Sequence, residues 1–256
     1  MMKKDFHMHT RFCDGRDTPE EMVCAAIEKG FSHIGICAHS YTFFDESYCL
    51  KKEQAEKYRL EIARLKECYK DKIQVFCGIE QDFYSTEPTD VYDYVIGSVH
   101  YVKVGDNYLP VDETPELLQK EVKEYFGGDF YAFCEKYFET VGNVAEQTNA
   151  DIIGHFDLIT KFNEGGCLFD ESDERYIAAW KKSADKLLQS GAVFEINTGA
   201  ISRGYRTAPY PAQSIISYLK ANGAKLILSS DAHSADTIGF GFEKYRALAD
   251  EEDVLF

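Results

Sequence analysis

The chain has 256 residues, of which 45% are hydrophobic and 14% aromatic, a composition typical of a globular protein with a sizeable core. Its formal net charge of −16 argues against nucleic acid as a partner, because binding to a phosphate backbone depends on clustered Lys and Arg. No apolar run approaches the roughly 18 residues of a membrane span, and the first residues lack the apolar segment of a signal peptide. We expect one soluble, cytoplasmic domain over residues 1–256 without a membrane partner, and leave its oligomeric state open.

Short β-rich runs alternate with helical patterns along the chain. A helix is predicted over residues 18–30, where Thr18 and Glu21 have capping-box spacing and Pro19 suits the first helical position. Apolar spacing predicts further helices over residues 51–70, 114–126 and 129–148, around 177–187 and around 215–219. A first strand ending in His7 and His9 is followed by strands predicted over residues 33–38, 73–80, 91–100, 151–155, 191–197 and 225–231. Seven strands alternating with helices predict an α/β fold with a mainly parallel sheet and no internal repeat.

Polar residues of the metal-binding types gather where these strands end. His7 and His9 lie two residues apart, so on a strand their side chains would share one face. The other residues at or just past strand ends, in chain order, are His39, Glu80, His100, His155, Glu195, Asp231 and His233. The carboxyl ends of parallel barrel strands lie on one face, where active sites are built, so these residues are predicted to meet. His33 falls at the start of its strand and is interpreted as structural.

Imidazole and carboxylate side chains together suit zinc, iron or manganese, and the sequence does not choose among these metals. The candidate ligands are His7, His9, Asp14, His39, Glu80, His100, His155, Asp231 and His233. One four-coordinate ion cannot use nine ligands, so we expect a polynuclear site in which a carboxylate such as Glu80 bridges two ions. The eight cysteines contain no C-x-x-C pair and are interpreted as reduced core residues rather than disulfides or a thiolate zinc site.

Metals about 3.5–4 Å apart are a recurrent device for phosphoester hydrolysis. Arg203 and Lys161 follow two strands on the same face and are the candidates for binding a phosphate, with Arg206 as a further one. The chain has no G-x-S-x-G elbow, no P-loop and no D-x-D after the first strand. By elimination, the predicted nucleophile is hydroxide bound to metal, and the predicted partner is a small phosphorylated substrate.

The motifs "HMHT" with "DG" (7–15), "AHS" (38–40), "GIE" (78–80), "GSVH" (97–100), "GHFD" (154–157) and "SDAH" (230–233) resemble those of the polymerase and histidinol phosphatase (PHP) family. The resemblance runs from residue 5 to about 240 and rests on the order and spacing of the motifs. It implies an α/β fold of the PHP type, a distorted seven-stranded (β/α)7 TIM-like barrel, with two or three divalent metal ions.

The resemblance also implies how the ligands are shared among three metal positions. They would be His7, His9, Glu80 and Asp231 for one ion; Glu80, His100 and His155 for a second; and Asp14, His39 and His233 for a third. Ala38 departs from the family, which more often has an acid before this histidine, so the support of His39 differs.

The stretches "GSVHY", "GHFDLITKFN" and "FEINTGAISRG" are similar to the stand-alone histidinol-phosphate phosphatase branch of the family. That branch hydrolyses L-histidinol phosphate to L-histidinol and phosphate in histidine biosynthesis. We expect catalytic roles for Glu80, Asp231 and His233, and substrate binding by Arg203, Lys161 and Glu195. Glu195 could instead lie behind the metal ligands, and the general acid, for which His233 and Asp14 are candidates, is not assigned.

Three other functions compete with this one. A nuclease-like or small-phosphomonoester PHP enzyme would share the chemistry, although the net charge disfavours a nuclease. An amidohydrolase also has H-x-H on its first strand, but often recruits a bridging lysine, and no lysine lies at a middle strand end here. A non-catalytic metal-binding module is disfavoured because every motif keeps its ligands.

Overall fold

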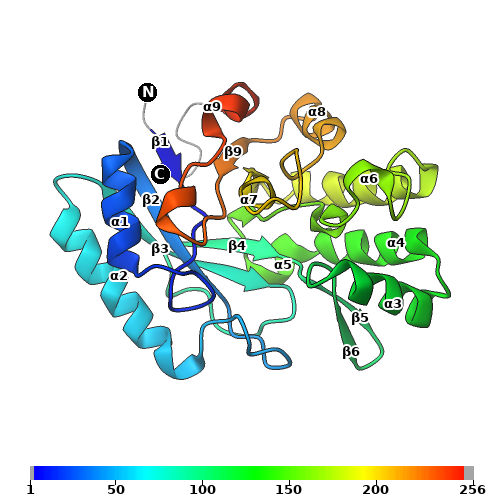
Figure 1. Ribbon diagram of the computed structural model, residues 1–256, viewed down its shortest axis with the longest axis horizontal. Helices are drawn as coiled ribbons and strands as arrows, with labels where there is room; N and C mark the ends of the chain where they lie inside the picture. The colour runs from blue at the N-terminus through cyan, green and yellow to red at the C-terminus, as the bar shows by residue number, and fades with distance from the viewer. Residues whose placement is uncertain (1–2, 251–256) are drawn as a thin grey trace.

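The computed structural model describes residues 3–250, and its centre is a seven-stranded parallel sheet that curls almost into a barrel (Figure 1). The strands lie in the spatial order β1-β2-β3-β4-β7-β8-β9, so neighbours in the chain are neighbours in the sheet. They are β1 (Lys3–Asp5), β2 (Phe31–His39), β3 (Gln74–Asp82), β4 (Tyr94–Ser98), β7 (Ile152–Ile153), β8 (Val193–Asn197) and β9 (Leu226–Ser229). The predicted fold class and all seven predicted strands are confirmed.

The two edges of the sheet meet just beyond the ends of β1 and β9. The backbone of Met8 pairs in parallel with Ala232, the His9 N–H donates to the Ala232 carbonyl at 2.8 Å, and the Cys37 N–H donates to Met8 at 3.0 Å. The regular part of β1 ends at Asp5, so the prediction that the strand extends through His7 and His9 is wrong in its bounds. The segment after Asp5 nevertheless continues the pairing and nearly closes the barrel.

Helices follow the strands and cover the outside of the sheet (Figure 1). They are α1 (Pro19–Glu28), α2 (Ala55–Tyr69), α3 (Pro115–Phe126), α4 (Phe130–Val141), α5 (Val144–Thr148), α6 (Glu174–Leu188), α7 (Gly199–Ser202), α8 (Gln213–Ala221) and α9 (Phe242–Tyr245). The predicted capping box of α1 is present, with reciprocal hydrogen bonds between Thr18 and Glu21. Single 3₁₀ turns cover Lys52–Gln54, Leu158–Thr160, Glu164–Gly166, Ala235–Thr237 and Arg246–Leu248. None of the helices in residues 3–250 is long and apolar enough to cross a membrane.

An antiparallel hairpin between β4 and α3 was not predicted from the sequence. It comprises β5 (Tyr101–Val104) and β6 (Asn107–Pro110), and Gly105 takes φ +59° in its two-residue turn. A positive φ favours glycine, which has no Cβ to clash and can therefore form the tight two-residue turn. Each strand has only four residues, too short to give a clear alternating pattern. The hairpin stands at the carboxyl end of the sheet.

The rings of Phe6, Phe76 and Tyr94 form a buried cluster with smaller apolar side chains, and two glycines accommodate the Tyr94 ring. A Cβ atom on Gly35 would lie 2.6 Å from the Tyr94 ring, and one on Gly78 would lie 2.5 Å from the Tyr94 hydroxyl. The Tyr94 hydroxyl crosses the barrel and donates to the Phe6 carbonyl at 2.6 Å. This close-packed interior lies below the carboxyl ends of the strands, so the polar residues at those ends are supported by rigid packing.

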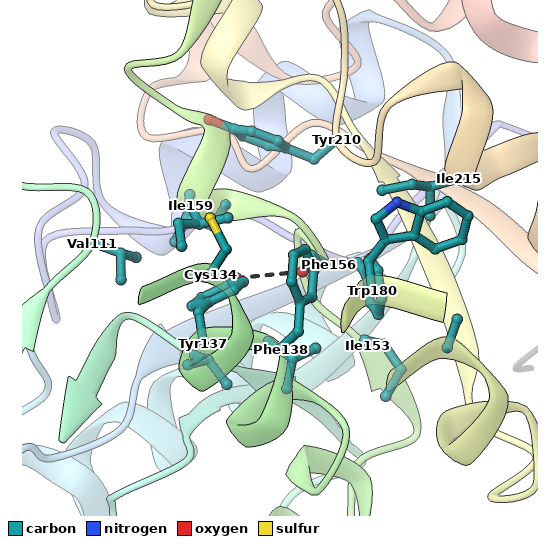
Figure 2. Packing of buried hydrophobic residues seen from close by; sticks show 14 of the residues in the cluster. Val111, Cys134, Tyr137, Phe138, Ile153, Phe156, Ile159, Trp180, Tyr210 and Ile215 are labelled. Atoms are coloured by element: carbon teal, nitrogen blue, oxygen red, sulfur yellow. Dashed lines mark hydrogen bonds between the residues drawn. The ribbon is translucent and has the colours of Figure 1, made fainter. Parts of the chain in front are cut away.

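A larger hydrophobic core lies between the sheet and helices α4 and α6 (Figure 2). Phe138 packs against Tyr137 and Phe156, and the Tyr137 hydroxyl donates to the Phe156 carbonyl at 3.4 Å. Trp180 of α6 belongs to the same cluster. The cysteines are all free, as predicted, but Cys68 and Cys167 are exposed, so their assignment to the core is wrong.

Candidate metal centre

All nine predicted metal ligands come together at the carboxyl end of the sheet. His39 is the last residue of β2, and Glu80 lies two residues before the end of β3. The others follow the ends of β1, β4, β7 and β9, within four residues except for Asp14, which lies nine residues after β1; they are His7, His9, Asp14, His100, His155, Asp231 and His233. The parallel sheet therefore assembles one cluster from six strands.

Glu80 is the centre of this cluster and contacts five histidines. Its Oε2 lies 2.8 Å from Nδ1 of His39 and 3.3 and 3.4 Å from Nε2 of His7 and His9. Its Oε1 lies 3.0 Å from His155 and 3.5 Å from His100. A carboxylate with each oxygen turned to a different set of imidazoles is arranged to bridge two positions.

The side chains of His7, His9 and Asp231 converge on one side of Glu80. The two Nε2 atoms of the histidines are 3.1 Å apart, and Oδ1 of Asp231 lies 3.7 and 3.4 Å from them. Asp231 adopts φ +47°, a conformation that is strained for a residue with a Cβ. The tertiary structure therefore holds Asp231 in an unfavourable backbone conformation beside the histidines.

A second group lies at the outer side of the cluster. Asp14 places Oδ1 3.6 Å from Nε2 of His39 and Oδ2 3.1 Å from Nε2 of His233. The turn carrying Asp14 is packed tightly, since a Cβ on Gly15 would lie 2.5 Å from the carbonyl carbon of His9. This contact explains the glycine that follows Asp14 in the sequence.

The electrostatics of the cluster hold Glu80 ionised and His9 neutral, whereas for His7, His39, His100 and His155 the neighbouring carboxylates outweigh the effect of burial and raise the pKa. Burial and the neighbouring His39 and His233 lower the pKa of His9 to about 3, which leaves its imidazole neutral. Burial raises the pKa of Glu80, but the charges of His39 and His7 outweigh it and hold the pKa well below the ordinary value. Neutral imidazole and ionised carboxylate are the forms that bind metal ions.

Glu195 supports the cluster from behind. Its Oε2 accepts from Nδ1 of His7 at 2.8 Å, and its Oε1 accepts from the His155 N–H at 2.6 Å and from Nδ2 of Asn197 at 2.8 Å. The side chains of Glu195 and His7 have no exposed surface. This buried carboxylate orients His7 and the turn at His155, a geometry that favours the supporting role of Glu195 over substrate binding.

Three supporting residues were not found by sequence reasoning. Asn197 links Glu195 to Asp231, 3.3 Å away, and Oδ2 of Asp82 contacts Nδ1 of His100 at 3.3 Å. Asp5 accepts hydrogen bonds from the backbone of Ser230 and His7, and burial raises its pKa to about 6. Asp82 follows Glu80 by two residues on β3, so same-face spacing was a usable signal for Asp82 alone.

Arg203 reaches the cluster from α7's carboxyl end. Its guanidinium donates to Oδ2 of Asp231 at 3.0 Å and to the Asp231 carbonyl at 2.9 Å, and lies 2.9 Å from Nδ1 of His233. A Cβ on Gly199 would lie 2.9 Å from this guanidinium, so the glycine keeps space for it. Arg206, in contrast, is buried and donates to the Thr160 carbonyl at 2.8 Å, away from the cluster.

A cavity of about 570 Å³ opens above the cluster. Arg203 and seven of the nine predicted ligands line its base. Its other wall contains Asp45, Tyr48, Tyr101, Asp112 and Lys161, among others. Lys161 lies on this wall with its Nζ 2.7 Å from the Asp112 carbonyl and 3.1 Å from Oδ2 of Asp112.

The residues of the cluster fit divalent metal ions. Oε2 of Glu80 is fully buried and has no hydrogen bond of good geometry, although three histidine nitrogens lie within 3.4 Å of it. Such convergence of buried lone pairs is costly unless a cation satisfies them. Two further groups with converging donor atoms are His9, Asp14, His39 and His233, and His39, Glu80 and His100.

Comparison with known proteins gives relatives along nearly the whole chain. The chain is 30% identical to a Deinococcus radiodurans protein named "Probable histidinol-phosphatase", covering 93% of this chain and 89% of the relative. A crystal structure from Listeria monocytogenes superposes with a TM-score of 0.84 at 21% identity, covering 95% of this chain and all of the other. The Lactococcus lactis histidinol phosphate phosphatase, solved with zinc, L-histidinol and phosphate, gives 0.67 at 24% identity, covering 96% and 92% of the two chains.

The PHP domain family matches residues 5–199, about three quarters of the chain, from the first histidine motif to the end of β8 and the turn after it. This range includes seven of the nine clustered ligands, and the remaining two, Asp231 and His233, follow β9. With the parallel barrel and the histidine cluster described above, the match establishes that the chain belongs to the PHP domain family.

Proposed function

We propose that this protein is a histidinol-phosphatase, a metal-dependent phosphoric monoester hydrolase that converts L-histidinol phosphate into L-histidinol and phosphate for histidine biosynthesis. The observation that carries the proposal is Glu80, placed among five histidines at the base of a cavity that also contains Arg203. The relatives named histidinol-phosphatase support the same substrate. A cavity walled by the β5–β6 hairpin also suits a small phosphomonoester better than a nucleic acid strand.

We propose that two or three divalent ions, of zinc, iron or manganese, are held by the clustered residues. One set is His7, His9, Glu80 and Asp231, a second is Glu80, His100 and His155, and a third is Asp14, His39 and His233. When bound, such ions supply a nucleophile at neutral pH and neutralise charge on the phosphoryl group. The chain fixes the orientation of the ligands, because Glu195 holds the imidazole of His7 and Asp82 holds that of His100.

Arg203 is proposed to bind the phosphoryl oxygens of the substrate. It is the guanidinium at the cavity base, and its planar donors match phosphate geometry. Asp231 and His233 both contact Arg203, so they also orient it toward the cavity. His233 and Asp14 remain the candidates for protonating the leaving alkoxide, because they form the solvent-facing edge of the cluster.

The test is phosphate release from L-histidinol phosphate, p-nitrophenyl phosphate and a dinucleotide, with metal content measured on the same preparation. We expect L-histidinol phosphate to have the highest kcat/KM, and two or three metal ions per chain. An Arg203→Met variant should raise the inhibition constant of inorganic phosphate, whereas Arg175→Met, on the exposed face of α6, should leave it unchanged. Equal turnover of all three esters would reject the substrate assignment and keep the phosphoesterase chemistry.

A further inference from the structure

We propose that Asp112 is the carboxylate that binds the ammonium group of the substrate, and that Lys161 positions Asp112 instead of binding phosphate. The inference rests on the proposed function, because L-histidinol phosphate carries an ammonium group on the carbon next to the methylene that bears its ester oxygen. A group that recognises this ammonium must therefore lie beside the metal cluster, on the wall of the same cavity.

The carboxylates that line the cavity are Asp14, Asp45, Glu80, Asp112, Glu113 and Asp231. Three of these belong to the histidine cluster. Asp45 is occupied by its own loop, since Oδ1 accepts from the Ser47 N–H and hydroxyl and Oδ2 accepts from the Tyr101 hydroxyl at 2.9 Å. Glu113 is exposed at the rim, where water screens its charge. Asp112 is the remaining acceptor for a cation inside the cavity.

The two oxygens of Asp112 have different surroundings. Lys161 donates to Oδ2 at 3.1 Å and to the Asp112 backbone carbonyl at 2.7 Å, which fixes the carboxylate from one side. Within residues 3–250, no group makes a hydrogen bond to Oδ1, and 28% of the Asp112 side chain is exposed toward the cavity it lines. One oxygen is therefore held, and the other can accept from a ligand.

Asp112 is ionised and close to the cluster. Burial raises its pKa, but Lys161, His100 and His155 outweigh this effect and hold the pKa below the ordinary value. The Val111 N–H donates to the His100 carbonyl at 2.9 Å, and Asp112 lines the same cavity as Glu80, His100 and His155, so the carboxylate lies on that side of the cluster. A phosphate bound at the base of the cavity would bring an ammonium two carbons from its ester oxygen toward this wall.

Lys161 is poorly placed to bind the phosphate itself. Its Nζ is committed to two oxygens of Asp112 and lies 4.7 Å from the centre of the Tyr205 ring, and only 12% of the side chain is exposed. A phosphate that approached this lysine would also meet the negative charge of Asp112. The phosphate role therefore falls to Arg203 alone, and the prediction that Lys161 binds phosphate is revised.

The test compares L-histidinol phosphate with its deamino analogue, imidazolylpropyl phosphate, which differs only by a hydrogen in place of the ammonium group. A hydrogen bond to a charged group predicts that Asp112→Asn lowers kcat/KM for L-histidinol phosphate roughly 10- to 100-fold. For the analogue, kcat/KM should stay within about two-fold of wild type, because it has no ammonium to lose. Calorimetric titration with L-histidinol should show the same loss of affinity without turnover.

Two variants separate recognition from structure. Glu113→Gln, the neighbouring carboxylate at the rim, should leave the preference for the amine unchanged. Lys161→Met should lower kcat/KM for L-histidinol phosphate selectively and leave the inhibition constant of inorganic phosphate unaltered. If Lys161 bound phosphate, its removal would raise that constant.

The outcomes distinguish the inference from the proposed function. If wild type does not prefer L-histidinol phosphate over p-nitrophenyl phosphate, the proposed function fails and the inference fails with it. If wild type has that preference but Asp112→Asn loses activity equally on both imidazole substrates, or keeps its preference for the amine, the function stands and the inference is overturned.

Discussion

Replacing Glu195 by glutamine tests how the histidine cluster is held in a ligating state. All three partners of this carboxylate, namely Nδ1 of His7, the His155 N–H and Nδ2 of Asn197, act as donors. In the neutral form that binds metal ions, this contact assigns the proton of His7 to Nδ1, which leaves a lone pair on Nε2 facing Glu80 and Asp231. Glu195 is thus an acceptor on every side.

A glutamine cannot reproduce that pattern in either orientation of its amide. With its NH₂ turned to His7, the imidazole proton must move to Nε2, the atom that faces the cluster. With its NH₂ turned the other way, it opposes the donors of His155 and Asn197. Losing a hydrogen bond to a charged group costs about 1.5–3 kcal/mol, and each 1.4 kcal/mol is about tenfold, so metal affinity should fall roughly 10- to 100-fold.

The assay is competition for zinc with a chromophoric chelator, supported by metal content after dialysis. Glu139→Gln, an exposed carboxylate of α4 paired with Lys136, serves as the matched control and should behave as wild type. Wild-type metal affinity in Glu195→Gln would refute the reasoning. If the variant keeps its metals but has a raised KM for the substrate, the result would instead indicate that Glu195 binds substrate.

Three further changes test separate parts of the structure. Burial raises the pKa of Glu121, on the inner side of α3, to about 7, so the folded state binds a proton more tightly than the unfolded chain and stability should fall as pH rises from about 4.5 to 7. Glu121→Gln should remove this fall, so its free energy of unfolding relative to wild type should rise by up to about 3 kcal/mol between pH 4 and pH 8. Urea unfolding measures this difference, and equal pH profiles of the two proteins would contradict the prediction. Gly15→Ala should push the turn of Asp14 away from His9 and lower both metal content and stability, the latter by about 1–3 kcal/mol, and full metal occupancy would show that the turn adapts. Phe138→Ala removes a buried ring packed on Tyr137, Phe156 and Tyr176 and should cost about 3–5 kcal/mol in denaturant, whereas an unshifted midpoint would mean that the core collapses around it.

The elements most accurately predicted from the sequence are those with a strong local signal. Helix α1 carries its own capping box, and the apolar period of residues 51–70 predicts α2. Bounds are less accurate where tertiary pairing decides them. Strand β3 continues past Glu80 to Asp82 because it pairs with β4 there, and β7 shrinks to Ile152–Ile153. The β5–β6 hairpin, with two four-residue strands, has no pattern long enough to detect.

The ligand cluster could be predicted because histidine is rare and its positions coincide with strand ends. Six of the seven histidines join the cluster, and His33 packs against Phe76 instead, as its position at the start of β2 indicates. The same reasoning favours Arg203 over Lys161 for the phosphate, because a guanidinium can bond bidentately, and it keeps Arg206 as a further candidate, since all three follow strands on the same face. Only the structure separates Arg203, at the cavity base, from Arg206, which is buried against Thr160.

The supporting carboxylates show why the rest of the site could not be predicted from the sequence. Asp5, Asp82, Asp112 and Glu195 are four of the 44 acidic residues in the chain. Glu195 is marked only by its place at a strand end and Asp82 only by its spacing from Glu80, and nothing in the local sequence of Asp5 or Asp112 separates them from acids on the surface. Their roles come from what lies opposite them: Ser230, His100, Lys161 and His7, which are all distant in sequence except His100. Ligands are thus recognisable by residue type at strand ends, whereas the groups that orient ligands and select substrate are defined by long-range contacts. Substrate specificity within this family should accordingly vary through residues such as Asp112, on the hairpin side of the cavity, while the histidine motifs stay the same.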